Sequence, residues 1–120
     1  MTPAVKLKTL RICVTDLRRS RDFYSRLFGL TPKEDQDNFV LFNLSGTNLE
    51  FVLADDKNPA STGGGIGYFE VTDLQKMIDS ATALGAKIWR GPLKISADGW
   101  SIVQIRDTAG NVIGFEGSLN

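Results

Sequence analysis

The chain has 120 residues, of which 42% are hydrophobic and 23% are charged, a composition typical of a single globular domain. Its 14 basic and 14 acidic residues give a formal net charge of zero, which offers no electrostatic attraction to nucleic acid or to anionic membranes, so we expect neither as a partner. The absence of histidine excludes histidine-based catalytic triads and removes the commonest ligand of transition metals.

The N-terminal sequence and the cysteine content bear on localisation. Residues 1–10, MTPAVKLKTL, show no apolar signal core followed by a small-residue cleavage site, and no stretch of the chain approaches membrane-spanning length. The single cysteine, Cys13, excludes an internal disulfide framework and fits a reducing compartment. We therefore expect a cytoplasmic protein.

The first half of the chain predicts a strand, a helix and three further strands. Residues 8–14, KTLRICV, alternate polar and apolar side chains, which indicates a half-buried strand. Thr15 or Asp16 then caps a helix in LRRSRDFYSRLF, whose apolar residues recur at helical spacing, and Gly29 ends it in the left-handed conformation. Short strands are expected at residues 30–33, 39–44 and 49–53.

The second half repeats this order. The tetrapeptide VTDL occurs at residues 14–17 and again at 71–74, each time between a predicted strand and a predicted helix. The second copy predicts a cap at Thr72 or Asp73, and Gly85 stops the helix. Its elements are a strand at 67–71, a helix at 74–84 and strands at 87–90, 100–106 and 112–117, the last two joined by the turn DTAGN.

Each half is too small to cover both faces of its own sheet, so the two halves are expected to combine. We predict an α+β fold in which two tandem βαβββ modules form a half-open β-barrel trough with the helices outside. The modules span residues 6–54 and 66–118 of one domain, residues 1–120. The polar segment 55–65, DDKNPASTGGG, is the predicted linker, with Gly63 to Gly65 as a flexible joint.

Two motifs resemble a known family. VTDLRRSRDFYSRLFGL resembles the first strand-to-helix signature of the vicinal oxygen chelate superfamily, and RDTAGNVIGFEG resembles its closing D-x-x-G-N hairpin. This is the family of glyoxalase I, bleomycin-resistance proteins, extradiol dioxygenases, methylmalonyl-CoA epimerase and fosfomycin-resistance enzymes. The resemblance covers nearly the whole chain and implies the fold predicted above. It also implies a homodimer, paired within each chain or swapped between two, but no single function.

Alternation along the strands predicts which side chains face the trough. The strand at 39–44 is apolar on both faces, and Asn43 favours Phe39, Leu41 and Asn43 as its trough side. Trp89, on a short strand near an edge, is expected at the rim or at a dimer contact. The predicted ligand-binding residues are Thr9, Arg11, Phe39, Asn48, Glu50, Tyr68, Trp100, Ile102, Gln104, Gly114 and Glu116.

The resemblance also bears on metal binding. In the metalloenzymes of the family, four residues hold the metal, one from the first strand and one from the last strand of each half. Carried over by position, these residues are Thr9, Glu50, Ile66 and Gly114. Only Glu50 is a strong ligand, whereas a catalytic transition-metal site needs about three protein ligands. We therefore expect no metal and no cofactor.

The resemblance leaves two functions open. The first is a metal-independent binding protein similar to the bleomycin-resistance branch, which holds a small, partly aromatic or cationic compound. The second is a glyoxalase- or dioxygenase-like enzyme, a lyase, isomerase or oxygenase, with an unconventional metal site or with Glu50 as a base. Glu50 is either a functional carboxylate or a remnant of a metal site. Arg11 either pairs with Glu50 or binds a carboxylate of the ligand.

Overall fold

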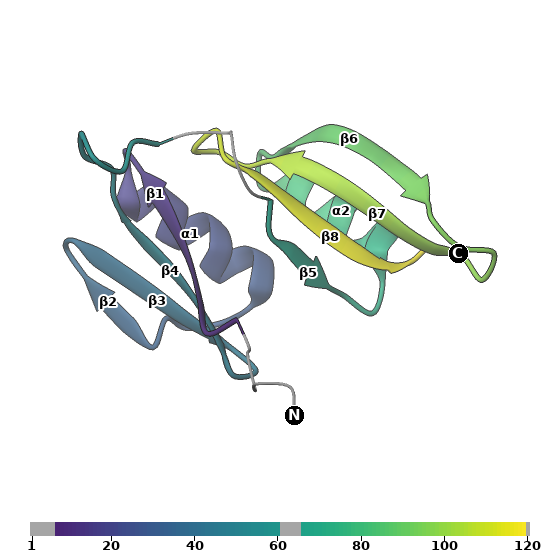
Figure 1. Cartoon of the computed structure of the whole chain (residues 1–120), viewed down its shortest axis with the longest axis horizontal. Coiled ribbons are helices and arrows are strands. Elements are labelled where there is room, and N and C mark those ends of the chain that lie inside the picture. Colours follow the sequence, from purple (N-terminus) through teal and green to yellow (C-terminus); the bar gives the residue numbers. More distant parts are fainter. Residues whose placement is uncertain (1–6, 61–65, 120) are drawn as a thin grey trace, which may run out of the picture. The chain divides into compact units, whose positions relative to one another are not determined.

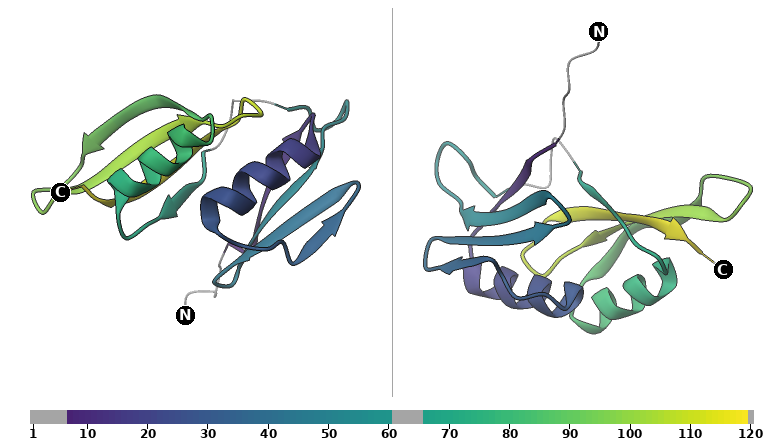
Figure 2. Two further views of the ribbon diagram at one scale, coloured as in Figure 1. Left: turned by 180° about the vertical axis from the view of Figure 1, so that it is seen from behind. Right: turned by 90° about the horizontal axis from the view of Figure 1, so that it is seen from below.

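A computed structural model of the chain describes residues 7–60 and 66–119 (Figure 1). By their contacts the residues fall into two units, Met1–Ala60 and Ser61–Asn120. In each unit a helix lies against one face of a four-stranded sheet (Figure 2). The predicted joint at Gly63 to Gly65 lies outside the described residues.

Unit 1 contains the first five elements of the chain. They are β1 (Thr9–Val14), α1 (Leu17–Phe28), β2 (Glu34–Gln36), β3 (Phe39–Leu44) and β4 (Thr47–Leu53). The strand order in the sheet is β1-β4-β3-β2. β1 runs parallel to β4, and the other neighbours are antiparallel. A parallel pair needs a crossover connection, which here includes α1.

Unit 2 repeats this topology. Its elements are β5 (Tyr68–Glu70), α2 (Leu74–Ala83), β6 (Lys87–Lys94), β7 (Trp100–Arg106) and β8 (Val112–Ser118). The strand order is β5-β8-β7-β6, with β5 parallel to β8. The α+β class and the two βαβββ modules are therefore confirmed. That the two sheets line a shared trough stays a prediction.

The predicted starts of both helices and the end of α1 are confirmed, and the structure selects one cap from each predicted pair. α2 ends at Ala83, one residue earlier than predicted. The Asp16 carboxylate accepts a hydrogen bond from the backbone N–H of Arg19 at 3.1 Å, and Asp73 caps α2 in the same way. Gly29 follows α1 with φ 64°, in the left-handed region that glycine adopts without strain. No helix in residues 7–60 or 66–119 is long and apolar enough to cross a membrane.

The strand expected at residues 30–33 is wrong, because β2 forms later, at Glu34–Gln36. The N–H of Leu30 donates to the carbonyl of Ser25 at 3.2 Å, so this segment still completes the end of α1. Pro32 has no N–H to donate to a strand ladder. All three residues of β2 are polar and exposed, and no hydrophobic alternation marks them.

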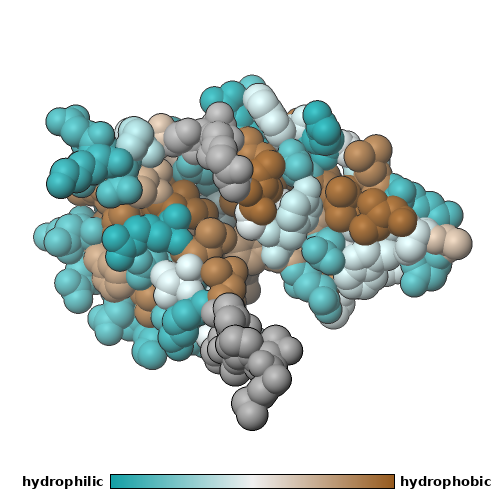
Figure 3. All heavy atoms as spheres, viewed as in Figure 1, coloured by the Kyte–Doolittle hydropathy of each residue, from teal (hydrophilic) through white to brown (hydrophobic). Residues whose placement is uncertain are grey.

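The core of each unit lies between its helix and its sheet. In unit 1 the ring of Tyr24 stacks on Phe51 with centroids 4.6 Å apart, and both side chains are fully buried. In unit 2 the apolar face of α2 and the buried Phe115 of β8 form the core. Other hydrophobic side chains of unit 2 are exposed, among them Trp89, Leu93 and Ile95. Figure 3 shows hydrophobic atoms at the surface of this unit.

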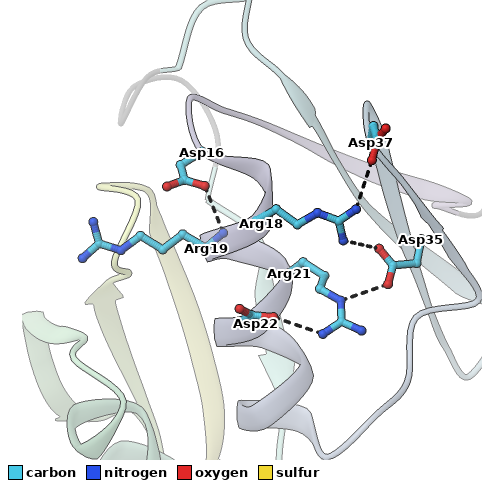
Figure 4. A network of polar contacts seen from close by, with 7 residues as sticks. All are labelled: Asp16, Arg18, Arg19, Arg21, Asp22, Asp35 and Asp37. Carbon is cyan, nitrogen blue, oxygen red and sulfur yellow. Dashed lines mark hydrogen bonds and ion pairs between the residues drawn. The ribbon is translucent and has the colours of Figure 1, made fainter.

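Charged side chains connect β2 to α1 (Figure 4). Asp35 accepts hydrogen bonds from Arg18 Nη1 at 3.1 Å and from Arg21 Nε at 3.0 Å, and Asp37 accepts one from Arg18 Nη2 at 3.2 Å. The hydrogen bonds from Arg21 to Asp22 and Asp35 raise the pKa of Arg21 above its usual value. Exposed ion pairs each stabilise little, so β2 depends on their sum and on its pairing with β3.

Two glycines allow β5 to lie close to β8. A β-carbon at residue 117 would overlap the backbone carbonyl oxygen of Val71, whose N–H donates to the carbonyl of Glu116 at 2.9 Å. A β-carbon at residue 114 would overlap the ring of Tyr68. The first obstacle is a backbone atom. The second is a partly exposed side chain, which can turn aside at the loss of one hydrogen bond, to Gln104.

We expect Gly117→Ala to lower the free energy of unfolding more than Gly114→Ala, by about 1–3 kcal/mol, the usual range for overpacking. The reason is that Val71 cannot move without loss of its strand pairing. Chemical denaturation of the two variants measures the difference. Added to Gly114→Ala, the substitution Tyr68→Ala should recover much of the lost free energy of unfolding. Added to Gly117→Ala, it should recover none. Equal effects of Tyr68→Ala in both backgrounds would contradict this account.

Candidate functional site

The strand register places the predicted ligand-binding residues on the sheet faces away from the helices. In unit 1, Phe51 stacks on Tyr24 of α1, so the neighbouring Glu50 points to the opposite face. Glu50 is the register partner of Arg11 in β1 and of Leu41 in β3, which share its face. Figure 1 looks onto this face of the sheet, with α1 behind it.

The face of unit 1 consists of three rows of side chains across β1, β4 and β3. The register confirms the face that Asn43 favoured for β3, because Asn43 pairs with Asn48 and its Nδ2 donates to Asn48 Oδ1 at 3.2 Å. The rows are Thr9, Asn48 and Asn43; Arg11, Glu50 and Leu41; and Cys13, Val52 and Phe39. The first row is polar, the third is mostly apolar, and the charged pair lies between them.

Arg11 and Glu50 form an ion pair across the β1–β4 ladder. Arg11 Nε donates a hydrogen bond to Glu50 Oε1. The Glu50 side chain is 9% exposed and the Arg11 side chain 59% exposed, so a buried carboxylate meets a largely solvated guanidinium. An unpaired carboxylate at this depth would be costly, and Arg11 provides its compensating charge. The pairing of Arg11 with Glu50, one of the two predicted roles of Arg11, is therefore present.

The predicted residues of unit 2 also share one face. Phe115 of β8 is fully buried on the α2 side, so its neighbours Gly114 and Glu116 lie on the other. Gly114 is the register partner of Tyr68 in β5 and of Gln104 in β7. The predicted ligand-binding residues on this face are Tyr68, Trp100, Ile102, Gln104, Gly114 and Glu116, and Glu70, the register partner of Glu116, shares it. Binding of a ligand by these residues, as by those of unit 1, stays a prediction.

Tyr68 crosses over Gly114 to reach the next strand. Its ring occupies the space that a side chain at residue 114 would take. Its hydroxyl accepts a hydrogen bond from Gln104 Nε2 at 2.8 Å. The ring is thus anchored at its far end, while 38% of the residue stays exposed as an aromatic surface.

Trp100 is held at the start of β7 by polar contacts on both sides. Its Nε1 donates to Glu116 Oε1 at 3.2 Å. Its backbone N–H donates to Asp98 at 3.1 Å, and Ser96 Oγ donates to the same carboxylate. These hydrogen bonds, that from Ser96 first, lower the pKa of Asp98 below its usual value. The indole therefore has a defined position beside the glutamate.

One contact in unit 2 was missed in the sequence. The guanidinium of Arg106 lies over the ring of Trp89, 5.3 Å from its centroid, within the range of a cation–π interaction. The pairing of β6 with β7 shifts register on both sides of Arg90, and alternation cannot be extended across such irregularities. The strand expected at residues 87–90 is also too short, because β6 continues past these register shifts to Lys94.

The two halves treat equivalent positions in the same way. Arg11 and Tyr68 each stand three residues before a copy of VTDL, so the repeat makes them equivalent. Arg11 is paired in register with Glu50, and Tyr68 with Gly114. Glu50 and Gly114 are the last-strand positions to which the resemblance assigns metal ligands. In each unit, a residue of the first strand therefore engages the ligand position of the last strand.

The residues present do not fit the metal that the resemblance implies. The carboxylate of Glu50 is bound by Arg11, the ring of Tyr68 covers Gly114, and Ile66 has no donor atom in its side chain. Within the described ranges no group of three or more His, Cys, Asp or Glu residues is placed to hold a metal ion. A catalytic site needs about three protein ligands, so these residues do not support metal chemistry.

The Arg11–Glu50 pair predicts an asymmetric effect of substitution. Arg11→Met leaves a buried carboxylate without a partner and should lower the free energy of unfolding by about 1–3 kcal/mol. Glu50→Gln leaves a guanidinium that water already solvates and should cost less. Chemical denaturation measures both, and in the double variant much of the loss should be recovered. A larger loss for Glu50→Gln would show that the carboxylate is not stabilised by this pair.

Comparison with known proteins covers nearly the whole chain. Residues 6–115 match the family model described as the Glyoxalase/Bleomycin resistance protein/Dioxygenase superfamily. Among curated proteins there is no match. A solved structure of a glyoxalase/bleomycin resistance protein/dioxygenase family enzyme from Burkholderia phytofirmans is 18% identical, with a TM-score of 0.79 over 94% of this chain and 98% of the other.

Two further solved structures are similar to the chain. A lactoylglutathione lyase from Agrobacterium tumefaciens is 21% identical, with a TM-score of 0.70 over 97% of this chain and 96% of the other. A glyoxalase/bleomycin resistance protein from Catenulispora acidiphila is 21% identical, with a TM-score of 0.69 over 93% and 98%. At these identities the likeness shows the fold and no activity. The match to the family model shows that the chain belongs to the Glyoxalase/Bleomycin resistance protein/Dioxygenase superfamily.

Proposed function

We propose that this protein is a metal-independent member of its superfamily that binds a small, partly aromatic compound. The observation that carries the proposal is the engagement of both last-strand ligand positions by the chain's own side chains. Arg11 binds the Glu50 carboxylate, and Tyr68 covers Gly114. A metal at these positions would have to displace Arg11 from a nearly buried carboxylate and move a ring whose hydroxyl is hydrogen-bonded to Gln104.

The side chains on the faces away from the helices support binding of an organic compound. Tyr68 and Trp100 each have a polar atom held by a neighbour and a ring partly open to solvent. Fixed aromatic rings provide contact area at a low cost in side-chain entropy, which favours planar ligands. Gln104 and Glu116 lie beside these rings and add polar groups that orient a ligand.

The alternative, a glyoxalase- or dioxygenase-like enzyme, needs either a metal or Glu50 as a base. Glu50 is nearly buried and shares its Oε1 with Arg11, so it is a poor candidate for proton transfer to an incoming substrate. The role of Glu50 is therefore to position Arg11. Metal-independent binding and metal-dependent catalysis differ in whether the protein needs a bound metal, and the metal content of the protein can be measured directly.

Protein purified without chelator should contain well below one equivalent of zinc, nickel, iron or manganese per chain by elemental analysis. Exhaustive dialysis against EDTA should leave its melting temperature and ligand affinity unchanged. As a control, the same dialysis should strip a known metalloenzyme of the family. A transition metal near one equivalent, needed for binding or turnover, would overturn the proposal in favour of the enzyme.

A thermal-shift screen of aromatic metabolites, antibiotics and thiol conjugates should identify compounds that raise the melting temperature, because a ligand of the folded state stabilises it. A compound present at 100 times its Kd adds about 2.7 kcal/mol. For such a compound Trp100→Ala should reduce the shift, since it removes a ring from the proposed surface. Gln75→Ala, an exposed change on α2, should not. Equal shifts in all three proteins would remove Trp100 from the site.

A further inference from the structure

The face of unit 1 is asymmetric in a way that bears on the charge of a ligand. The row on one side of Arg11 carries the hydroxyl of Thr9 and the amide of Asn48. The row on the other side carries Val52 and Phe39, which are only partly buried. Neighbouring residues on one face of a strand are about 6–7 Å apart, so the guanidinium lies within one side-chain length of both rows.

The pairing with Glu50 leaves part of the Arg11 guanidinium available. Glu50 Oε1 accepts from Nε, and within the described part of the chain neither Nη atom has a hydrogen-bond partner. The two Nη groups form the edge that binds a carboxylate through parallel hydrogen bonds. The contact at Nε restrains the side chain, so less conformational entropy is lost when a ligand binds.

We propose that the compound bound by this protein is a small organic anion, whose carboxylate contacts the Nη groups of Arg11 and whose apolar part lies over Val52 and Phe39. This inference rests on the proposed function and names its ligand class. Asn48 adds a donor: its Oδ1 accepts a hydrogen bond from Asn43, and its Nδ2 donates to no residue in the described part of the chain. A carboxylate near Arg11 thus meets donors from two strands.

A cationic ligand fits this face less well. Glu50 was the residue that favoured a cation, but its side chain is only 9% exposed and is already paired. A cation that approached it would first meet the exposed guanidinium of Arg11, and it would have to replace that partner. The accessible charge on this face is therefore positive, although the pair is neutral as a whole.

The test compares three probes that share one ring and differ in charge: benzoate, benzamide and benzylamine. NMR titration of the labelled protein gives each Kd and shows whether the Nε–H signal of Arg11 and the amide signal of Asn48 shift. We expect benzoate to bind at least about tenfold more tightly than benzamide, because a charge-assisted hydrogen bond is the stronger kind. Benzylamine should bind most weakly.

The variants separate the role of Arg11 from its effect on folding. Arg11→Met should make the Kd of benzoate equal to that of benzamide, and Arg11→Lys, which keeps a charge beside Glu50, should give an intermediate ratio. Arg19→Met is the matched control, since it removes the same charge from α1, on the other face of the sheet (Figure 4). It should leave the ratio unchanged. The melting temperature of each variant, measured first, confirms that it is folded.

Several outcomes would overturn the inference. They are equal binding of benzoate and benzamide by the wild type, a preference for benzylamine, a benzoate-to-benzamide ratio that survives Arg11→Met, or no binding by any probe. In these cases the proposed function still stands if the thermal-shift screen finds a ligand whose binding needs no metal. A stoichiometric metal required for binding would instead overturn the proposed function itself.

Discussion

In each unit, the parallel pairing of the first strand with the last decides which side chains meet on the face away from the helix. The crossover through the helix places that helix on one face of the sheet, and alternation leaves the other face to residues of opposite parity. This constraint puts Arg11 opposite Glu50 and Tyr68 opposite Gly114. A shift of the first strand by one residue in either ladder would turn its side chain, Arg11 or Tyr68, toward the core.

The two units use this shared geometry with different chemistry. In unit 1 a guanidinium neutralises a carboxylate, and in unit 2 an aromatic ring takes the space of an absent side chain. Both arrangements engage positions that the resemblance associates with metal ligation, and of these two positions only Glu50 has a ligating side chain, which is paired with Arg11. Membership in the superfamily thus accounts for the frame of the molecule, while the proposed binding rests on the residues of the open faces.

The alternation of polar and apolar residues in strands and their helical spacing in helices predicted most of the fold. Alternation identified β1, β4, β7 and β8, and the two aspartate caps and Gly29 set the helix ends. The position of β2 was not predicted, because its three exposed polar residues show no hydrophobic alternation. The contact between Arg106 and Trp89 was not predicted either, because register shifts interrupt the alternation of side chains along β6. The predicted site residues fell on the expected faces, but the Tyr68–Gln104 bond depends on side-chain reach, which sequence spacing does not encode. The trough and the homodimer stay predictions.

The attachment of β2 has a consequence for how the two halves respond to their surroundings. Its side chains bury no apolar surface, and carboxylates and guanidiniums at the protein surface join it to α1. Dissolved salt screens such contacts, whereas it barely affects packed rings and ladders. A change in ionic strength therefore alters the attachment of β2 to α1 and leaves the packed core of unit 1 largely unaffected. Two copies of one topology therefore differ in their sensitivity to the salt around them.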